Sequence, residues 1–344
     1  MAISPYARIT NALGLTPPYA SGAIEMMHGN VRNQQEAKMT QEIGGRRMQI
    51  GTFARTGDRW LDDRPLGFGD IKELTLTAEA VGLDSFWLPD HFVFHPHEPD
   101  QLGCWEGFTF LSALAGVTST IALGPLVAAT SFRNPALLAK MAATLDEIAQ
   151  GRFILGLGAG NWEPEHAMFG YPFDHRVGRF EEALQIIAPL LREGAVDFHG
   201  RYYQAPHCVL SPRGPSPSGP PIWGGARGDR MLRIIAKYAD AYNAIWPITP
   251  AQVTAQRERM VAACTEVGRD PATLDLTAGT FVSLPVHSQP VADDRSICGT
   301  YEEIAAQLQA FADLGVRHLI VDFRPEISVQ TIEEFGRVLE LLKQ

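Results

Sequence analysis

The chain has 344 residues, of which 45% are hydrophobic and 20% are charged, and its formal net charge is −10. This length allows either two domains or one large α/β barrel, the acidic balance argues against a nucleic-acid partner, and no apolar run is long enough to span a membrane. The amino-terminal residues lack the basic and apolar blocks of a secretory signal and the four cysteines form no CxxC pair, so we expect a cytoplasmic protein with reduced thiols.

Residues 1–47 differ in composition from the rest of the chain. They contain several turn-forming Pro and Gly residues, few aliphatic side chains and a polar run over residues 32–40. Such a segment has little apolar surface of its own to bury. We therefore expect an N-terminal arm or flexible extension over residues 1–47, followed by one folded domain over residues 48–344.

After this arm, apolar strand patterns alternate with amphipathic helix patterns. The first strand is predicted over residues 48–54 and its helix over residues 70–81. The second strand covers residues 84–88 and leads to a helix over residues 105–117. Between these two elements, residues 94–103 are rich in Pro and His and predict an irregular loop.

The clearest strand-helix-strand pattern lies between residues 120 and 161. Asn134 is a good helix N-cap, Pro135 suits the first helical position, and Gly151 is typical of a helix end. The apolar runs on either side of this helix predict parallel strands, since a helical crossover joins them. Both strands are followed by small residues, which leave room for a flat ligand at the edge where α/β folds bind ligands.

The remaining pattern adds further units and one insertion. A helix over residues 178–193 precedes a hairpin turn at His199-Gly200. The last four units each consist of a predicted strand followed by a predicted helix. Their strands cover residues 221–223, 241–246, 274–284 and 317–322, and their helices cover residues 229–238, 249–267, 301–314 and 328–342. Eight such units predict a (β/α)8 TIM barrel with insertion loops at its C-terminal face. Two doubly wound domains are the alternative, but no linker divides the chain and no GxGxxG turn follows the first strand.

Asp90 and His91 follow the second strand, so a barrel would place them at its mouth. A histidine there can give or take a proton near neutral pH, and the adjacent carboxylate is expected to orient it. The alternative is a polar turn in which Asp90 only caps the chain. His95 and His97 lie nearby, but no regular zinc-ligand spacing or cysteine supports them, so we expect no metal site.

Gly224, Gly225, Ala226 and Arg227 follow the fifth strand and precede a helix. Free backbone N–H groups at a helix start suit a phosphate, and the arginine would add a charge-assisted bond. A tight turn beside a surface arginine is the alternative interpretation. Trp246, at the end of the sixth strand, is a candidate substrate wall, although its type is more often found in a core.

Three stretches of the chain carry a family resemblance: DSFWLPDHF at residues 84–92, the run from LGPLVAATSFRNP to GLGAGNWEPEH at residues 123–166, and PPIWGGARGDRMLRIIAKYADAYN at residues 220–243. They resemble the luciferase-like monooxygenase superfamily, and within it they are most similar to the deazaflavin-dependent oxidoreductases that use coenzyme F420. The resemblance covers about residues 48–342. It implies the same luciferase-like barrel, a small-molecule substrate and a homodimer.

The resemblance also implies roles for individual residues. Asp90-His91 would place the histidine near the reactive carbon of the cofactor ring. Leu126-Val127 would form a bulge, often a non-prolyl cis peptide, that backs the ring. The other cofactor contacts fall on Ala159, Gly160 and Asn161 after the fourth strand, and on Gly224, Gly225, Ala226 and Arg227 at the phosphate.

We therefore expect an oxidoreductase that transfers a hydride between F420 and a small organic substrate, with His91 handling the accompanying proton and Asp90 orienting it. An FMN-dependent luciferase-like monooxygenase is the first alternative, and a cofactor-binding barrel without turnover is the second. The glycine-rich turn at residues 224–226 is shorter than in the resembled relatives, which leaves the phosphate contacts open. Residues 285–299 carry no recognisable substrate signature, so the substrate and the direction of transfer also stay open.

Overall fold

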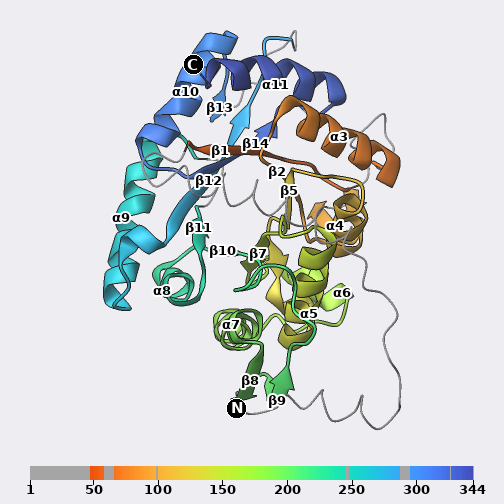
Figure 1. Ribbon diagram of the computed structural model, residues 1–344, viewed down its shortest axis with the longest axis vertical. Coiled ribbons are helices and arrows are strands. Elements are labelled where there is room, and N and C mark those ends of the chain that lie inside the picture. The colour runs from red at the N-terminus through yellow and green to blue at the C-terminus, as the bar shows by residue number, and fades with distance from the viewer. Residues whose placement is uncertain are drawn as a thin grey trace, which may run out of the picture. The chain divides into compact units, whose positions relative to one another are not determined.

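The computed structural model describes residues 47–57, 66–97, 100–244, 248–286, 295–325 and 327–343. Within these residues, parallel strands follow one another around a sheet whose outer side is covered by helices (Figure 1). The order of the strands around this sheet is β5 (Ala122–Pro125), β2 (Ser85–Leu88), β1 (Gln49–Phe53), β14 (His318–Phe323), β12 (Asp275–Val282), β11 (Ala241–Asn243), β10 (Ile222–Gly225), β7 (Leu155–Gly158) and β6 (Ala128–Ala129).

The sheet closes because β5 and β6 occupy one strand position, interrupted by Leu126 and Val127. β6 pairs with β7, and Leu123 of β5 forms a parallel bridge with Phe153, just before β7. On the other side, β1 pairs with both β2 and β14. The described residues therefore form a ring of eight strand positions in parallel register, which confirms the (β/α)8 barrel predicted from the sequence.

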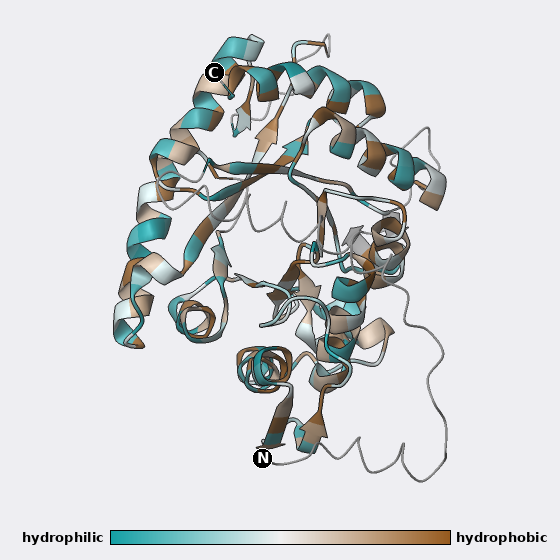
Figure 2. Cartoon of the chain, viewed as in Figure 1, coloured by the Kyte–Doolittle hydropathy of each residue, from teal (hydrophilic) through white to brown (hydrophobic). Residues whose placement is uncertain are grey.

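The helices outside this ring begin and end close to where the sequence predicts. Asn134 accepts hydrogen bonds from the N–H groups of Ala136 and Leu137, as an N-cap does, and Gly151 has a φ of 83° after the helix. The barrel helices are α3 (Phe68–Val81), α4 (Gly107–Ala115), α5 (Pro135–Ile148), α7 (Arg176–Glu193), α8 (Asp229–Tyr238), α9 (Pro250–Glu266), α10 (Tyr301–Asp313) and α11 (Val329–Leu341). Figure 2 shows hydrophilic and hydrophobic stripes on these helices, as amphipathic helices on a sheet require. Among the described helices, none has the length and apolar character needed to cross a membrane.

Several shorter elements interrupt the regular alternation, and two of them differ from the sequence prediction. The loop predicted over residues 94–103 is instead an antiparallel pair, β3 (Val93–His97) and β4 (Asp100–Gly103). A short helix, α6 (Glu163–Met168), was not predicted. The hairpin predicted at His199-Gly200 is present as β8 (Ala195–His199) and β9 (Gln204–Val209). The remaining short elements are η1 (Thr130–Phe132), η2 (Pro271–Thr273) and β13 (Ser296–Ile297), which pairs with β12.

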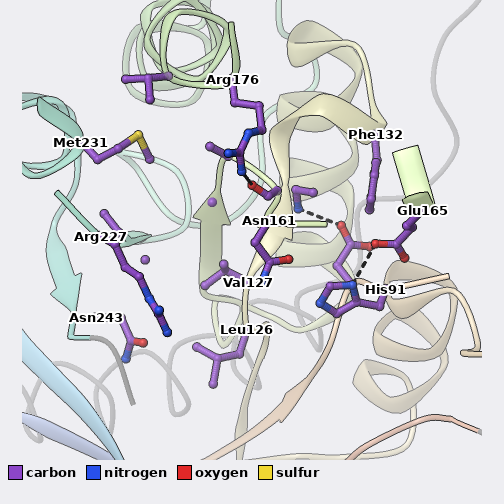
Figure 3. Close-up of a pocket in the computed structure, with 18 of the residues that line it drawn as sticks. His91, Leu126, Val127, Phe132, Asn161, Glu165, Arg176, Arg227, Met231 and Asn243 are labelled. Atoms are coloured by element: carbon purple, nitrogen blue, oxygen red, sulfur yellow. Dashed lines mark hydrogen bonds and ion pairs between the residues drawn. The ribbon is translucent and has the colours of Figure 1, made fainter. Parts of the chain in front are cut away.

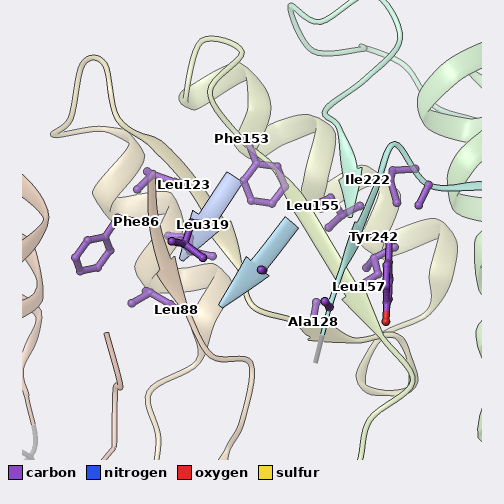
Figure 4. Close-up of a cluster of buried hydrophobic side chains, with 14 of the residues drawn as sticks. Phe86, Leu88, Leu123, Ala128, Phe153, Leu155, Leu157, Ile222, Tyr242 and Leu319 are labelled. Carbon is purple, nitrogen blue, oxygen red and sulfur yellow. The ribbon is translucent and has the colours of Figure 1, made fainter. Parts of the chain in front are cut away.

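Side chains that alternate along the strands supply two separate apolar layers. Phe86 and Leu88 of β2 point outward and join the large core between the sheet and its helices (Figure 4). Trp87 of the same strand belongs to a smaller cluster inside the ring, with Phe53, Leu126, Trp223, Ala241 and Ile320. The period of two along a strand therefore divides one apolar run between an outer core and an inner one.

The inner cluster is built around two tryptophans. The ring centroids of Trp87 and Trp223 are 4.7 Å apart, and the His318 ring meets Trp223 edge-on at 4.9 Å. Ser85 joins them because its Oγ accepts from Trp87 Nε1 at 2.6 Å and lies 2.7 Å from His318 Nε2. These bulky, mutually bonded side chains fill the interior of the barrel at the level of β2 and β10, so the open space begins above them.

Candidate functional site

A cavity of about 490 Å³ opens at the C-terminal ends of strands β2, β6, β7, β10 and β11 (Figure 3). The sequence prediction located most of its lining correctly. The predicted residues that line it are Asp90, His91, Leu126, Val127, Ala159, Gly160, Asn161, Gly225, Ala226 and Arg227. Gly224 is not among them, and Trp246 lies outside the residues that the structure describes.

The floor of the cavity is the break between β5 and β6. Leu126 packs with the tryptophan cluster inside the barrel, whereas the Val127 side chain lies against β7 and β10. A Cβ at Gly158 would lie 2.7 Å from Val127 Cγ2, and one at Gly225 would lie 3.2 Å from Val127 Cγ1. The two glycines therefore make room for Val127 and leave the Leu126-Val127 peptide at the cavity. This peptide bond is cis, as the family resemblance implied.

His91 is held at the edge of the cavity by a buried carboxylate. Its Nδ1 lies 2.9 Å from Glu165 Oε2, and the Glu165 side chain is 1% exposed, compared with 25% for His91. Glu165 also accepts the backbone N–H groups of Phe92 and Val93 through its other oxygen. Because a carboxylate only accepts hydrogen bonds, this contact places the ring proton of a neutral His91 on Nδ1.

This contact corrects the expectation that Asp90 orients His91. The carboxylate of Asp90 is buried and accepts two bonds from the Arg133 guanidinium, at 2.7 and 2.8 Å, and one from Ala129 N at 3.1 Å. Asp90 therefore ties the end of β2 to β6. Adjacent residues after a strand point to different sides, so the Asp90 carboxylate meets Arg133 while the His91 ring meets Glu165.

Arg133 completes this tie. Its guanidinium bonds Glu106 as well as Asp90 and lies 4.4 Å above the ring of Phe108. Burial opposes the charge, but the hydrogen bonds and attraction of Asp90 and Glu106 outweigh it and raise the pKa of Arg133. Arg133 thus joins Asp90 and Glu106 in one hydrogen-bonded network beneath the cavity wall.

The loop after β7 is fixed from both sides. The carbonyl of Gly160 accepts from Arg176 Nη1 at 2.7 Å, and Gly160 has a φ of 73°, a conformation that favours glycine. Beneath it, the buried ring of His166 lies 2.8 Å from Ser131 Oγ and 2.8 Å from the carbonyl oxygen of Trp162. Ala159, Gly160 and Asn161 are therefore presented to the cavity by a firmly anchored turn.

The predicted phosphate turn is only partly at the cavity. A Cβ at Gly224 would lie 2.4 Å from Ile235 Cγ1 of α8, so this glycine is required for packing of the helix on the sheet. Gly224 does not line this cavity, and its phosphate contact stays a prediction. Gly225, Ala226 and Arg227 do line the cavity, and Arg227 extends along its edge (Figure 3).

Other lining residues were not predicted from the sequence. Asn243 ends β11, where its Nδ2 donates to Thr277 Oγ1 at 2.9 Å. The other unpredicted lining residues are Ala129, Phe132, Gly158, Glu165, Arg176, Val177, Met231 and Ala244. The sequence feature that most of these residues share is their position directly after a barrel strand or at the start of the helix that follows it. In the described part of the chain, no group of three or more His, Cys, Asp or Glu residues is placed to hold a metal ion.

Comparison with known proteins agrees with this architecture. The family model described as luciferase-like monooxygenase matches residues 48–289. The pyrimidine monooxygenase RutA of Variovorax paradoxus is 30% identical over 308 residues, which cover 79% of this chain and 78% of that protein. A phthiodiolone/phenolphthiodiolone dimycocerosates ketoreductase of Mycobacterium bovis is 32% identical over 215 residues, which cover 57% of this chain and 56% of the ketoreductase. The chain thus matches little more than half the length of that relative.

Solved structures show the same fold at low identity. An F420-dependent secondary alcohol dehydrogenase in complex with an F420-acetone adduct has a TM-score of 0.72 at 20% identity, covering 86% of this chain and 99% of that one. The EDTA monooxygenase of Chelativorans sp. BNC1 has a TM-score of 0.69 at 15% identity, covering 87% and 94%. The family match over most of the barrel, supported by these relatives, shows that the chain belongs to the luciferase-like monooxygenase family.

Proposed function

We propose that the protein is an oxidoreductase that transfers a hydride between coenzyme F420 and a small organic substrate at the barrel mouth. The observation that carries this proposal is the His91 ring, anchored through Nδ1 by Glu165 and placed beside the cavity above the Leu126-Val127 backbone. When bound, the deazaflavin supplies the two-electron redox chemistry, and the protein supplies geometry and proton transfer.

The cavity suits a flat cofactor. Its volume of about 490 Å³ falls within the usual range of small-molecule sites, roughly 300–1,000 Å³. Gly158, Ala159, Gly225 and Ala226 line part of it with backbone and methyl groups only, so a planar ring can approach the backbone there. Asn161 and Asn243 offer amide groups at its edge, and Arg227 offers a positive charge for a phosphate.

The role of His91 follows from the chemistry of carbonyl reduction. Hydride addition to a carbonyl carbon leaves negative charge on the oxygen, which a proton from Nε2 of the imidazolium form of His91 neutralises, leaving the neutral ring with its proton on Nδ1. In the opposite direction, the same nitrogen accepts the proton of a secondary alcohol. Glu165 holds the ring in one tautomer and stabilises the charged imidazolium in either direction.

The competing function is an FMN-dependent monooxygenase, which the similarity to a pyrimidine monooxygenase favours. The similarity to a ketoreductase and the F420-dependent dehydrogenase fold favour hydride transfer to a carbonyl. The test is to titrate the apoprotein with F420 and with FMN, then to add ketones or secondary alcohols while recording cofactor absorbance and oxygen consumption. We expect F420 binding and substrate-dependent absorbance change without oxygen uptake. FMN binding with oxygen consumption would overturn the proposal.

A further inference from the structure

The cavity beside His91 takes up only part of the barrel mouth. Around the ring, β12, β14 and β1 lie between β11, which ends in Asn243 at the cavity, and β2, which leads to His91 (Figure 1). These strands run parallel to their neighbours, so their carboxyl ends open at the same mouth. The residues at the ends of β12, β14 and β1 therefore border the mouth between Asn243 and His91.

Two of these strand ends carry charged side chains that point into the barrel. Phe53 of β1 and Ile320 of β14 belong to the apolar cluster inside the ring. Arg55 and Asp322 come two residues later, so they also point inward, but nearer the mouth. Their side chains meet there, since Arg55 Nη2 lies 2.8 Å from Asp322 Oδ2. On this side of the mouth, the level above the apolar cluster is therefore charged.

Arg324, two residues after Asp322, adds a second positive charge to the same carboxylate. Its Nη2 lies 3.0 Å from the Asp322 oxygen that Arg55 also bonds. Its guanidinium carbon lies 3.9 Å from the ring centroid of Phe281 on β12, so the aromatic ring supports the group from one face. In the described part of the chain, the bond to Asp322 is the one hydrogen bond of this guanidinium, and Nε is buried without an acceptor. Arg324 therefore keeps N–H donors for a ligand.

One carboxylate thus serves two guanidinium groups. The Asp322 side chain is 6% exposed, whereas Arg55 and Arg324 each keep 20% of their side chains exposed at the mouth. Burial lowers the pKa of Arg55; the attraction of Asp322 opposes this effect, whereas repulsion from Arg324 adds to it. An anion bound beside the two arginines would relieve this repulsion and supply the acceptors that Arg324 lacks.

We infer that Arg324, with Arg55 beside it, binds a carboxylate of the substrate, so that the preferred substrates are oxo acids and the matching hydroxy acids rather than neutral ketones and alcohols. The inference rests on the proposed function and names its substrate class. A planar carboxylate accepts two parallel bonds from a guanidinium, which orients the substrate as well as holding it. Asp322 fixes the arginines but repels the same carboxylate, so it limits the affinity.

The experiment compares pyruvate, acetoacetate and levulinate, each with its methyl ester, because the three acids differ in the spacing between carbonyl and carboxylate. Two quantities are measured on the full-length protein: kcat/KM with reduced F420, and the Kd of each compound by calorimetry without any cofactor. The variants are Arg324→Gln, which removes the proposed donors, and Asp322→Asn, which removes the competing charge. Arg233→Gln is the matched control, because Arg233 lies on α8 and pairs with Glu266 on α9. Thermal unfolding of each variant verifies that it is folded.

We expect the wild type to prefer at least one acid over its ester by about 10- to 100-fold, the usual effect of hydrogen bonds to a charged group. Arg324→Gln should lose this preference through a weaker reaction with the acid, with the ester little changed. Asp322→Asn should strengthen the preference, and Arg233→Gln should behave as wild type. The opposite signs of the first two variants distinguish recognition from a structural role, in which both variants would lower kcat/KM for acid and ester alike.

Two results separate the inference from the proposed function. F420-dependent turnover of acids and esters with equal kcat/KM would overturn the inference and leave the proposed function standing. FMN-dependent oxygen consumption without F420 turnover would overturn the proposed function and, with it, the assignment of oxo acids as hydride acceptors. In that case, the calorimetric Kd values of the wild type and Arg324→Gln still decide whether the arginine binds carboxylates, and equal values would overturn that part as well.

Discussion

The lower interior of the barrel and its mouth are built by the same strands in opposite ways. β2 and β10 contribute Trp87 and Trp223 to the interior, where the centroids of the two tilted rings lie 4.7 Å apart. A few residues further, the same strands end in His91 and in Gly225 at the cavity. Large side chains fill one level and small ones line the next, so the tryptophans form a solid base beneath an open site. Stability and chemistry are thereby separated along the barrel axis.

The sharpest way to test this separation is to remove the proposed proton carrier at the mouth. His91→Ala should lower the rate of hydride transfer by about 100- to 10,000-fold, the usual contribution of a positioned acid or base. Cofactor affinity should change by only a few-fold, because the cavity walls remain. Single-turnover absorbance kinetics and equilibrium titration measure the two quantities. If rate and affinity both stayed at the wild-type level, His91 would not be the proton carrier, whereas absence of hydride transfer in the wild type itself would favour a cofactor-binding barrel without turnover.

A substitution in the interior of the barrel should instead lower the stability of the fold. Trp87→Ala removes a fully buried side chain and its bond to Ser85, so the free energy of unfolding should fall by about 3–5 kcal/mol. Trp87→Phe, which keeps an aromatic ring, should cost less. Urea unfolding measures both variants. An unchanged urea midpoint for Trp87→Ala would show that the interior is not the rigid base described above.

The pH dependence of stability tests the same region. Burial, with a smaller effect of Arg47, lowers the pKa of His318 from 6.5 to about 3. The folded protein therefore keeps this ring neutral, while the unfolded chain takes up a proton below pH 6.5. The stability that comes from keeping this ring neutral is fully present above pH 6.5 and is lost as the pH falls toward 3. At pH 5, the free energy of unfolding should be lower by up to about 2 kcal/mol for this reason. His318→Asn should show a shallower fall in urea midpoint between pH 6.5 and 5, and an identical slope would contradict the assignment.

The smallest expected effect comes from a single methyl group in the cavity wall. Gly158→Ala would place a Cβ 2.7 Å from Val127 Cγ2 and push that side chain toward the cavity. We expect about a 10-fold loss of cofactor affinity, or about 1.4 kcal/mol, measured by titration. Gly69→Ala is the control, because no heavy atom lies within 4 Å of its added Cβ on helix α3. Equal cofactor affinities of the two variants would show that the cavity wall accommodates the added methyl group.

The barrel could be predicted from the sequence because its signals are local. Asn134, Pro135 and Gly151 mark one crossover helix, and similar caps and apolar runs repeat along the chain. The β3–β4 hairpin was missed because proline and histidine are poor strand signals, while its pairing is supplied by the neighbouring segment. The short helix α6 was missed because six residues show no clear helical period.

The site was predictable in its location but not in its contacts. Residues after parallel strands meet at one edge, so the positions of His91 and Asn161 followed from the barrel alone. The partner of His91 did not, because Glu165 is 74 residues away, and adjacency in the sequence suggested Asp90 instead. Gly224 and Gly225 illustrate a second limit. Neighbouring strand residues face opposite sides, and the sequence did not show which glycine faces the cavity.

The bonds of Asp90 and His91 also bear on how this barrel could be recombined. Both residues belong to the second strand-helix unit, yet their partners Arg133 and Glu165 come from the third and fourth. A chimera that exchanged only the second unit with a homologue would retain a complete ring of strands. Its histidine, however, would have to bond a carboxylate at position 165 that comes from the other parent. Units two to four should therefore be exchanged together, and the crossover points of a shuffling experiment should lie outside residues 85–166.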